Sequence, residues 1–308
     1  MEFSTITNVE PARLLDFDAD VFITTLGFET RCTSVARLYE GKRCRKIALS
    51  RTDHLKEFSF RENRTYYQEH NFEIIPVEKK VPDVDSLLVP VKKERIKILL
   101  DCTSMSPRWY YEFFRWFSES QELYQTVTLR IAYTMAGYTG SDHPRKVKAV
   151  REFLESQRNP DDLGETVLIM GLGHEKQIGQ SIYNIVKPDL LYLFYADPPV
   201  EKKFVEKTFV NNHSLIEATP IRNLIAYPIH NGQAIYHSLI NTILPLRNRY
   251  TIVIVPHGPK IFSLVAMLVQ AGYPDAVISY PVFKKSPAVD RIPSGDPVLL
   301  DLIFEGDE

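Results

Sequence analysis

The chain has 308 residues, of which 44% are hydrophobic and 25% are charged, as in ordinary soluble globular proteins. Its 37 Lys and Arg residues nearly balance 39 Asp and Glu residues, and this net charge of −2 excludes an overall basic surface for nucleic acid or anionic membrane. Three cysteines without metal-binding spacing, no apolar run of membrane-spanning length and no secretory signal pattern predict a cytoplasmic protein that is not membrane-bound.

Short β-branched and apolar runs predict strands in both halves of the chain, and amphipathic patterns predict helices between them. The first half has predicted strands over 20–26, 46–50, 72–77, 96–102 and 127–133, and predicted helices over 31–39, 62–70 and 109–118. The second half has predicted strands over 166–170, 190–195, 224–229, 251–255 and 276–281, and predicted helices over 175–186, 199–209, 234–246 and 261–270. Strands that alternate with helices indicate βαβ units and a parallel sheet.

The segment 142–165 is predicted to form a helix followed by a polar linker with a turn at 159–162. We therefore predict two domains, over 1–156 and 165–308. A last strand over 297–304 follows a loop rich in Pro and Gly and is expected to be an antiparallel edge strand.

The two halves repeat the same landmarks in the same order. "ITTLGFETRC" begins at Ile23, and "IMGLGHEKQI" begins at Ile169. Later, "LLDCTSMSPR" and "TIVIVPHGPK" each run from an apolar strand through a short loop into a helix, and a strand ending in Tyr follows. The sequence therefore predicts an α/β fold of two tandem Rossmann-like parallel-sheet halves that arose by internal duplication.

The repeated loops are the candidate ligand sites, because open parallel sheets bind ligands beyond the carboxyl ends of their strands. Helix N-termini there also attract anions. The predicted ligand-binding residues are Gly27, Glu29, Arg31, Asp101, Thr103, Ser104 and Arg108 in the first half, and Gly173, Glu175, Asp197, Gly258 and Lys260 in the second. If the protein is an enzyme, His257 and Arg108 are the candidate catalytic residues.

Two features leave alternatives open. Each Glu could accept a hydrogen bond from a ligand, or it could simply be an acid in a first helical turn. Gly171, Gly173 and Gly179 give G-x-G-x₅-G, which departs from the dinucleotide pattern, although Asp197 lies 24 residues (197 − 173) after Gly173. We expect no metal site and no resident cofactor.

An apolar strand, then "LLDCTSMSPR", a helix and "RIAYT" resemble the ligand loop of CARF-type sensor domains and of the related SAVED domains. Asp101 and Thr103 match the family pattern, Ser104 and Met105 replace its glycines, and Arg108 stands near its Lys. In the second half, only Gly258 and Lys260 match the motif.

The resemblance implies a sensor subunit of a prokaryotic defence system. Such a subunit would bind a nucleotide-like ligand, such as a cyclic oligonucleotide, in a cleft between the two halves. It could act with a separate effector protein chain or as a homo-oligomer. The first alternative is an enzyme, either a metal-independent ring-nuclease-like phosphodiesterase or a nucleoside/phosphoribosyl-type enzyme. The second alternative is an NAD(P)-dependent enzyme.

Overall fold

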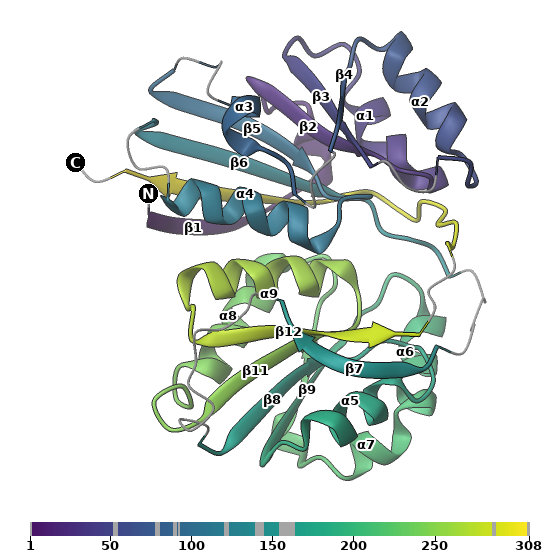
Figure 1. The fold of residues 1–308 in the computed structure, drawn as a ribbon, viewed down its shortest axis with the longest axis vertical. Coiled ribbons are helices and arrows are strands. Elements are labelled where there is room, and N and C mark those ends of the chain that lie inside the picture. Colours follow the sequence, from purple (N-terminus) through teal and green to yellow (C-terminus); the bar gives the residue numbers. More distant parts are fainter. Residues whose placement is uncertain are drawn as a thin grey trace. The chain divides into compact units, whose positions relative to one another are not determined.

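The computed structural model describes residues 2–51, 55–77, 81–88, 91, 93–119, 123–138, 145–153, 164–284 and 288–306. The chain divides into two compact units, each with its own sheet and helices (Figure 1). Unit 1 comprises Met1–Thr139 and Ala288–Glu308, and unit 2 comprises Gly140–Pro287. Unit 1 is therefore assembled from two separate stretches of the chain.

The sheet of unit 1 has seven strands in the order β1-β13-β6-β5-β2-β3-β4. The five strands from β6 to β4 are parallel, whereas β13 is antiparallel to β6 and β1 is antiparallel to β13. The strands are β1 (Glu2–Val9), β2 (Val21–Leu26), β3 (Arg45–Ser50), β4 (Glu73–Pro76), β5 (Arg95–Asp101), β6 (Thr126–Tyr133) and β13 (Val298–Glu305).

Helical segments cover both faces of this sheet. One face carries η1 (Pro11–Leu14), η2 (Thr30–Thr33), α1 (Ser34–Leu38) and α2 (Phe60–Glu69), whose apolar residues form one core with Phe22, Leu99 and Leu299. Alternation along β13 directs Phe304 to the opposite face. There its ring centroid lies 5.3 Å from that of Phe117 in α4 (Pro107–Glu119), which packs beside α3 (Val84–Leu88).

The sheet of unit 2 has six strands in the order β10-β9-β8-β11-β12-β7. All are parallel except β7, which is antiparallel to β12. The strands are β7 (Val147–Glu152), β8 (Thr166–Gly171), β9 (Leu190–Ala196), β10 (Leu224–Tyr227), β11 (Thr251–Pro256) and β12 (Ala276–Phe283).

Helices also lie on both faces of the second sheet (Figure 1). Leu168, Met170 and Leu193 share a core with α5 (Ile178–Val186) and α7 (His213–Glu217). On the other face, Phe262 of α9 (Lys260–Gly272) packs against Phe194, with ring centroids 5.4 Å apart. The remaining helical elements of the second half are α6 (Lys202–Asn211), η4 (Ile221–Asn223) and α8 (Gly232–Ile243).

The parallel strands have the same order in both units, which confirms the expected pair of Rossmann-like halves. Numbered along each half, the order is 3-2-1-4-5, the arrangement of dinucleotide-binding folds. A sixth, antiparallel strand then pairs with the fifth strand, and these sixth strands are exchanged. β7 follows β6 along the chain but pairs with β12, and β13 follows β12 but pairs with β6.

The exchange corrects several sequence-based expectations. The predicted helix within 142–165 is wrong, because 147–152 forms β7 by pairing with residues more than 120 positions later (279 − 152 = 127). β13 is not an edge strand, because β1 covers its outer side. The observed division also differs from the predicted domains 1–156 and 165–308. The predicted turn at 159–162 lies outside the described residues.

β1 was not predicted, and its register explains why. The pairing with β13 is regular from Thr5 to Val9, so the buried residues Ile6 and Val9, three positions apart, lie on opposite faces, and no apolar residue recurs at every second position. Within the described residues, no helix is both apolar enough and long enough to cross a membrane.

Phe304→Ala tests whether the last strand belongs to unit 1. Phe304 is fully buried, so its truncation should cost about 3–5 kcal/mol in urea denaturation. Hydrogen exchange should accelerate in β1 and β6, which flank β13, before it changes in β8 and β11. Glu305→Ala, at the exposed end of the same strand, is the matched control. Faster exchange in β8 and β11 alone would contradict the strand exchange.

Candidate functional site

The loops after the first and fourth parallel strands of unit 1 touch each other. A Cβ atom added to Gly27, which follows β2, would lie 2.9 Å from the Cβ of Ser104, which follows β5. Such a distance is too short for two carbon atoms, so only glycine fits at position 27. This contact is at the topological switch point of the sheet, where ligands bind in open α/β folds.

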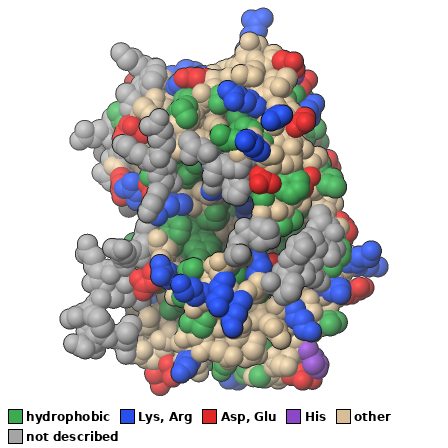
Figure 2. Space-filling view, turned by 45° about the vertical axis from the view of Figure 1, so that its right-hand side comes forward, with side chains coloured by type: hydrophobic (Ala, Val, Ile, Leu, Met, Phe, Trp, Pro, Cys, Tyr) green, Lys and Arg blue, Asp and Glu red, His purple; other side chains and the backbone are tan. Residues whose placement is uncertain are grey.

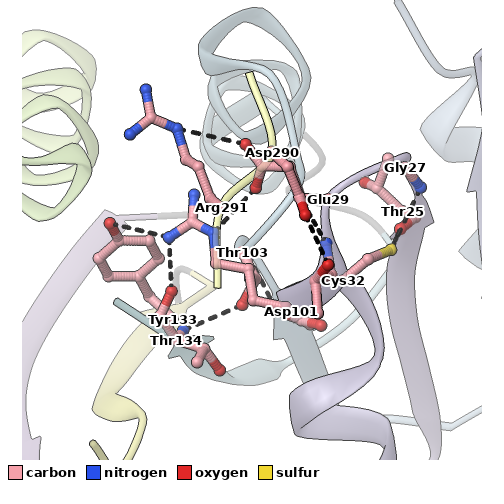
Figure 3. Close-up of polar contacts among 12 residues, drawn as sticks. Thr25, Gly27, Glu29, Cys32, Asp101, Thr103, Tyr133, Thr134, Asp290 and Arg291 are labelled. Carbon is pink, nitrogen blue, oxygen red and sulfur yellow. Dashed lines mark hydrogen bonds and ion pairs between the residues drawn. The ribbon is translucent and has the colours of Figure 1, made fainter. Parts of the chain in front are cut away.

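Two predicted ligand residues on the β5–α4 loop instead support the loop itself. Asp101 and Thr103 are fully buried. The carboxylate of Asp101 accepts hydrogen bonds from the hydroxyl of Thr24 and the backbone N–H of Thr103, both at 2.9 Å. Thr103 Oγ1 accepts a bond from the backbone N–H of Thr134 at 3.0 Å (Figure 3). Buried side chains with such contacts fix the strand end and do not offer groups to a ligand.

Of the predicted ligand residues on this loop, Arg108 is exposed and Ser104 is partly buried. Arg108 is the second residue of α4, whose first residue is Pro107, a residue that suits the first position of a helix. The Oγ of Ser104 has no hydrogen-bond partner among the described residues, although it adjoins the thiol of Cys32. An exposed guanidinium in the first turn of a helix is suited to an anion, whereas the Ser104 hydroxyl is buried in this structure.

The β2–η2 loop is held by side chains from several elements. Asn63 on α2 donates hydrogen bonds to the carbonyls of Gly27 and Glu29, at 3.0 and 2.9 Å. Cys32 Sγ accepts the backbone N–H of Gly27 at 3.2 Å and bonds to the carbonyl of Thr25. Burial raises the pKa of Cys32 to about 11, so this thiol is structural and not a nucleophile.

Arg31, another predicted ligand residue, is only 3% exposed. Its guanidinium donates to Glu29 Oε2 at 2.8 Å and to the carbonyl of Thr134 at 2.7 Å. Burial opposes its charge, but Tyr133 and Glu29 outweigh burial and raise the pKa of Arg31. Arg31 is therefore a permanent buried cation that orients Glu29 and links η2 to the residue that follows β6.

A second arginine reaches Glu29 from the far end of the sequence. Arg291 lies in the segment that leads into β13, and its Nε is 3.4 Å from Glu29 Oε1 (Figure 3). The neighbouring Asp290 accepts hydrogen bonds from the N–H and hydroxyl of Thr30, both at 2.7 Å. Sequence reasoning missed Arg291 because more than 260 residues (291 − 29 = 262) separate it from Glu29.

The corresponding loops of unit 2 meet in the same way. A Cβ atom on Gly173, after β8, would lie 3.1 Å from His257 Nε2, on the loop after β11. A Cβ atom on Gly258 would lie 2.9 Å from the carbonyl oxygen of Leu172. Glycine at both positions lets the two loops approach closely. The structure therefore brings Gly173, His257 and Gly258 together at the second switch point.

Two further contacts repeat those of unit 1. Asn212, which follows α6, donates a hydrogen bond to the carbonyl of Gly173 at 3.0 Å, as Asn63 does to Gly27. Glu175 is bound by Arg145, whose Nη2 lies 2.6 Å from Oε2, as Glu29 is bound by Arg291. Both arginines lie just before an exchanged strand. This correspondence links the two Glu residues that the sequence repeats at the same offset.

His257 and Glu175 form a partly buried pair in unit 2. His257 Nε2 lies 3.4 Å from Glu175 Oε2, and the His257 side chain is 10% exposed. Burial, helped by Arg145 and His174, lowers the pKa of His257 to about 4 despite the attraction of Glu175. Burial favours the neutral form of Glu175, yet Arg145 and His257 hold the pKa of its carboxyl below the usual range. At neutral pH the pair is a carboxylate beside a neutral imidazole.

The glycines of the G-x-G-x₅-G segment face protein atoms. A Cβ atom on Gly171 would lie 2.6 Å from the ring of Phe262, and one on Gly179 would lie 2.6 Å from Asn212 Oδ1. Their small size is thus explained by packing within unit 2. Asp197 is exposed directly after β9, and Lys260 is the first residue of α9. Pro259 precedes that helix instead of starting it.

Among the described residues, no group of three or more His, Cys, Asp or Glu side chains is placed to hold a metal ion. No protein-family model matches the sequence, and a search of curated proteins finds no significant match.

Gly27→Ala tests the close approach of the two loops in unit 1. The added methyl group should clash with Ser104 and cost about 1–3 kcal/mol of unfolding free energy. Ser104→Gly in the same protein should recover most of that loss, because it removes the opposing Cβ. Gly272→Ala, where no atom lies within 4 Å, is the control and should not destabilise. The absence of rescue in the double variant would contradict the contact.

His257→Asn tests the environment of the buried imidazole. The folded protein holds the pKa of His257 below that of the unfolded chain, so His257 lowers stability as pH falls from about 6.5 toward 4. Between pH 7 and 4.5, urea denaturation should show that the wild type loses roughly 2 kcal/mol more than the variant. The control is His213→Asn, at a side chain that is 68% exposed. Equal losses in the wild type and His257→Asn would contradict the assignment.

Proposed function

We propose that the chain binds an anionic, phosphorylated, nucleotide-like ligand at the switch-point loops of its Rossmann-like units. The observation that carries the proposal is the paired arrangement found in both units. In each, a glycine after the first strand touches the loop after the fourth strand, and that loop leads into a 13-residue helix. A basic residue occupies the first turn of each helix, Arg108 in α4 and Lys260 in α9.

The chemistry of these helix starts favours anions. The first backbone N–H groups of a helix have no intrahelical partner, and the helix dipole makes that end positive. Arg108 and Lys260 add full charges at the same ends. Acidic and basic side chains are interspersed on the face shown in Figure 2, which does not suggest one continuous surface for a nucleic-acid backbone. A compact ligand with one or a few phosphates is therefore the better candidate.

The loop that resembles the CARF and SAVED ligand motif adds a narrower hypothesis. It suggests that the ligand is a cyclic oligonucleotide and that the chain is a sensor in a prokaryotic defence system, acting with a separate effector chain. The burial of Asp101 and Thr103 does not conflict with this hypothesis if the two residues shape the loop while Ser104 and Arg108 meet the ligand. The sensor role and the defence context rest on the resemblance alone.

Arg108→Ala tests the proposed site in unit 1. The protein would be screened by thermal shift with cyclic di-, tri- and tetranucleotides, nucleoside mono- to triphosphates, phosphoribosyl compounds and NAD(P). The affinity for any stabilising ligand would then be measured by calorimetry. Loss of a charged hydrogen bond should weaken binding about tenfold or more. Arg95→Ala is the matched control, because Arg95 is exposed at the opposite end of β5.

Equal losses in Arg108→Ala and Arg95→Ala would contradict a strand-end site in unit 1. Binding of none of the ligands would overturn the proposal. Turnover of the bound ligand in the presence of EDTA would instead support the metal-independent phosphodiesterase alternative. His257 beside Glu175 is then the pair whose substitution should abolish product formation.

A further inference from the structure

The imidazole of His257 stands between the two switch-point loops of unit 2 with an unused nitrogen. Its Nε2 is buried, faces the Cα of Gly173 and has no hydrogen-bond partner among the described residues. The nearest acid oxygen, Glu175 Oε2, is 3.4 Å away and is already bonded to Arg145. A buried polar atom without a partner is costly, so this atom points to a missing proton or ligand.

The charged groups around His257 come from two segments. Glu175 and His174 lie on the β8–α5 loop, and Arg145 lies in the segment before β7. Arg145 opposes the attraction that Glu175 would exert on an imidazolium. A bound anion would add a negative charge that Arg145 does not already pair with. This charge would favour the protonated form of His257.

The same loop opens α9, a helix of 13 residues with Lys260 in its first position. The positive end of the helix dipole and the charge of the lysine lie close to His257 along the chain. Gly258 lets the loop approach the carbonyl of Leu172 closely, which places the β11–α9 loop against the β8–α5 loop. The helix start and the unused Nε2 are two independent features that fit one oxyanion.

We propose that the start of α9 binds a phosphate-type oxyanion and that His257 takes up a proton as the anion binds. This inference rests on the proposed function for the position of the ligand. The proton comes from solvent and adds to the neutral ring, which then donates N–H bonds as an imidazolium. By linkage, the affinity for the anion rises as pH falls. Ser104 occupies the corresponding contact in unit 1 and cannot be protonated, so only unit 2 has this proton dependence.

Nitrogen NMR of the histidine rings tests the proposal on the wild-type protein, and a variant serves only to assign the signal. The protein has eight histidines, and His257→Asn identifies the signal of interest. The probe is sulfate, whose charge is constant over the range of pH 4 to 8. The titration midpoint of His257 should rise by at least about one pH unit in saturating sulfate, equivalent to tenfold coupling. The exposed His213 is the internal reference and should not respond.

The outcomes separate this inference from the proposed function. If sulfate shifts the amide signals of Gly258 and Lys260 but not the titration of His257, the proton coupling is overturned and the anion site stands. If sulfate perturbs neither, the inference is overturned, and the Arg108→Ala measurement in unit 1 still decides the proposed function. Lys260→Ala should weaken the sulfate effect, whereas Ser104→Ala should leave the His257 titration unchanged.

Discussion

The fifth parallel strand of each sheet needs a partner on its outer edge, and the chain meets this need by exchanging sixth strands. An unpaired strand edge exposes backbone donors and acceptors and invites wrong pairing. β13 covers β6, and β7 covers β12, each as an antiparallel strand contributed by the following or preceding half. Neither half of the sequence can therefore complete its own sheet. The exchange thus makes each sheet depend on residues from the other half of the sequence.

The exchanged strands also complete the candidate sites. Each is preceded by an arginine that binds the glutamate of the first switch-point loop, Arg291 to Glu29 and Arg145 to Glu175. Asn63 and Asn212 then fix the glycine carbonyls of those loops. The two sites share this framework but differ at the loop contact. Unit 1 has a hydroxyl at this contact, and unit 2 has an imidazole. The same fold therefore places two chemically different groups at the corresponding position.

Much of the fold could be predicted from sequence, because its parallel strands are short apolar runs separated by amphipathic helices. All ten predicted parallel strands form, and the repeated "LG" and loop motifs correctly marked the two switch points. Three predictions failed. β1 was not predicted, β7 was predicted to be part of a helix, and β13 was predicted to lie at the edge of its sheet. In β1, apolar residues do not alternate with polar ones, and the pattern "VKAVRE" of β7 suits a helix in isolation. Only pairing with distant β12 makes this segment a strand.

The candidate sites were predicted less completely than the fold. The glycines, both glutamates and His257 do gather at the switch points, but Asp101, Thr103 and Arg31 turn inward and brace the loops. Local sequence could not show this, because burial depends on partners such as Thr24 and Thr134. Arg145 and Arg291 left no local signal at all. Their positions follow from the strand exchange, which was itself not predicted.

The most direct measurement is a crystal structure of the protein soaked with selenate, with anomalous diffraction recorded at the selenium edge. Selenate has the shape and charge of a bound phosphate or sulfate, and its anomalous signal marks its position without prior assumptions. We expect peaks at the first turns of α4 and α9, beside Arg108 and Lys260. Selenate bound only elsewhere, with both helix starts empty, would contradict the claim that the switch-point loops form anion sites.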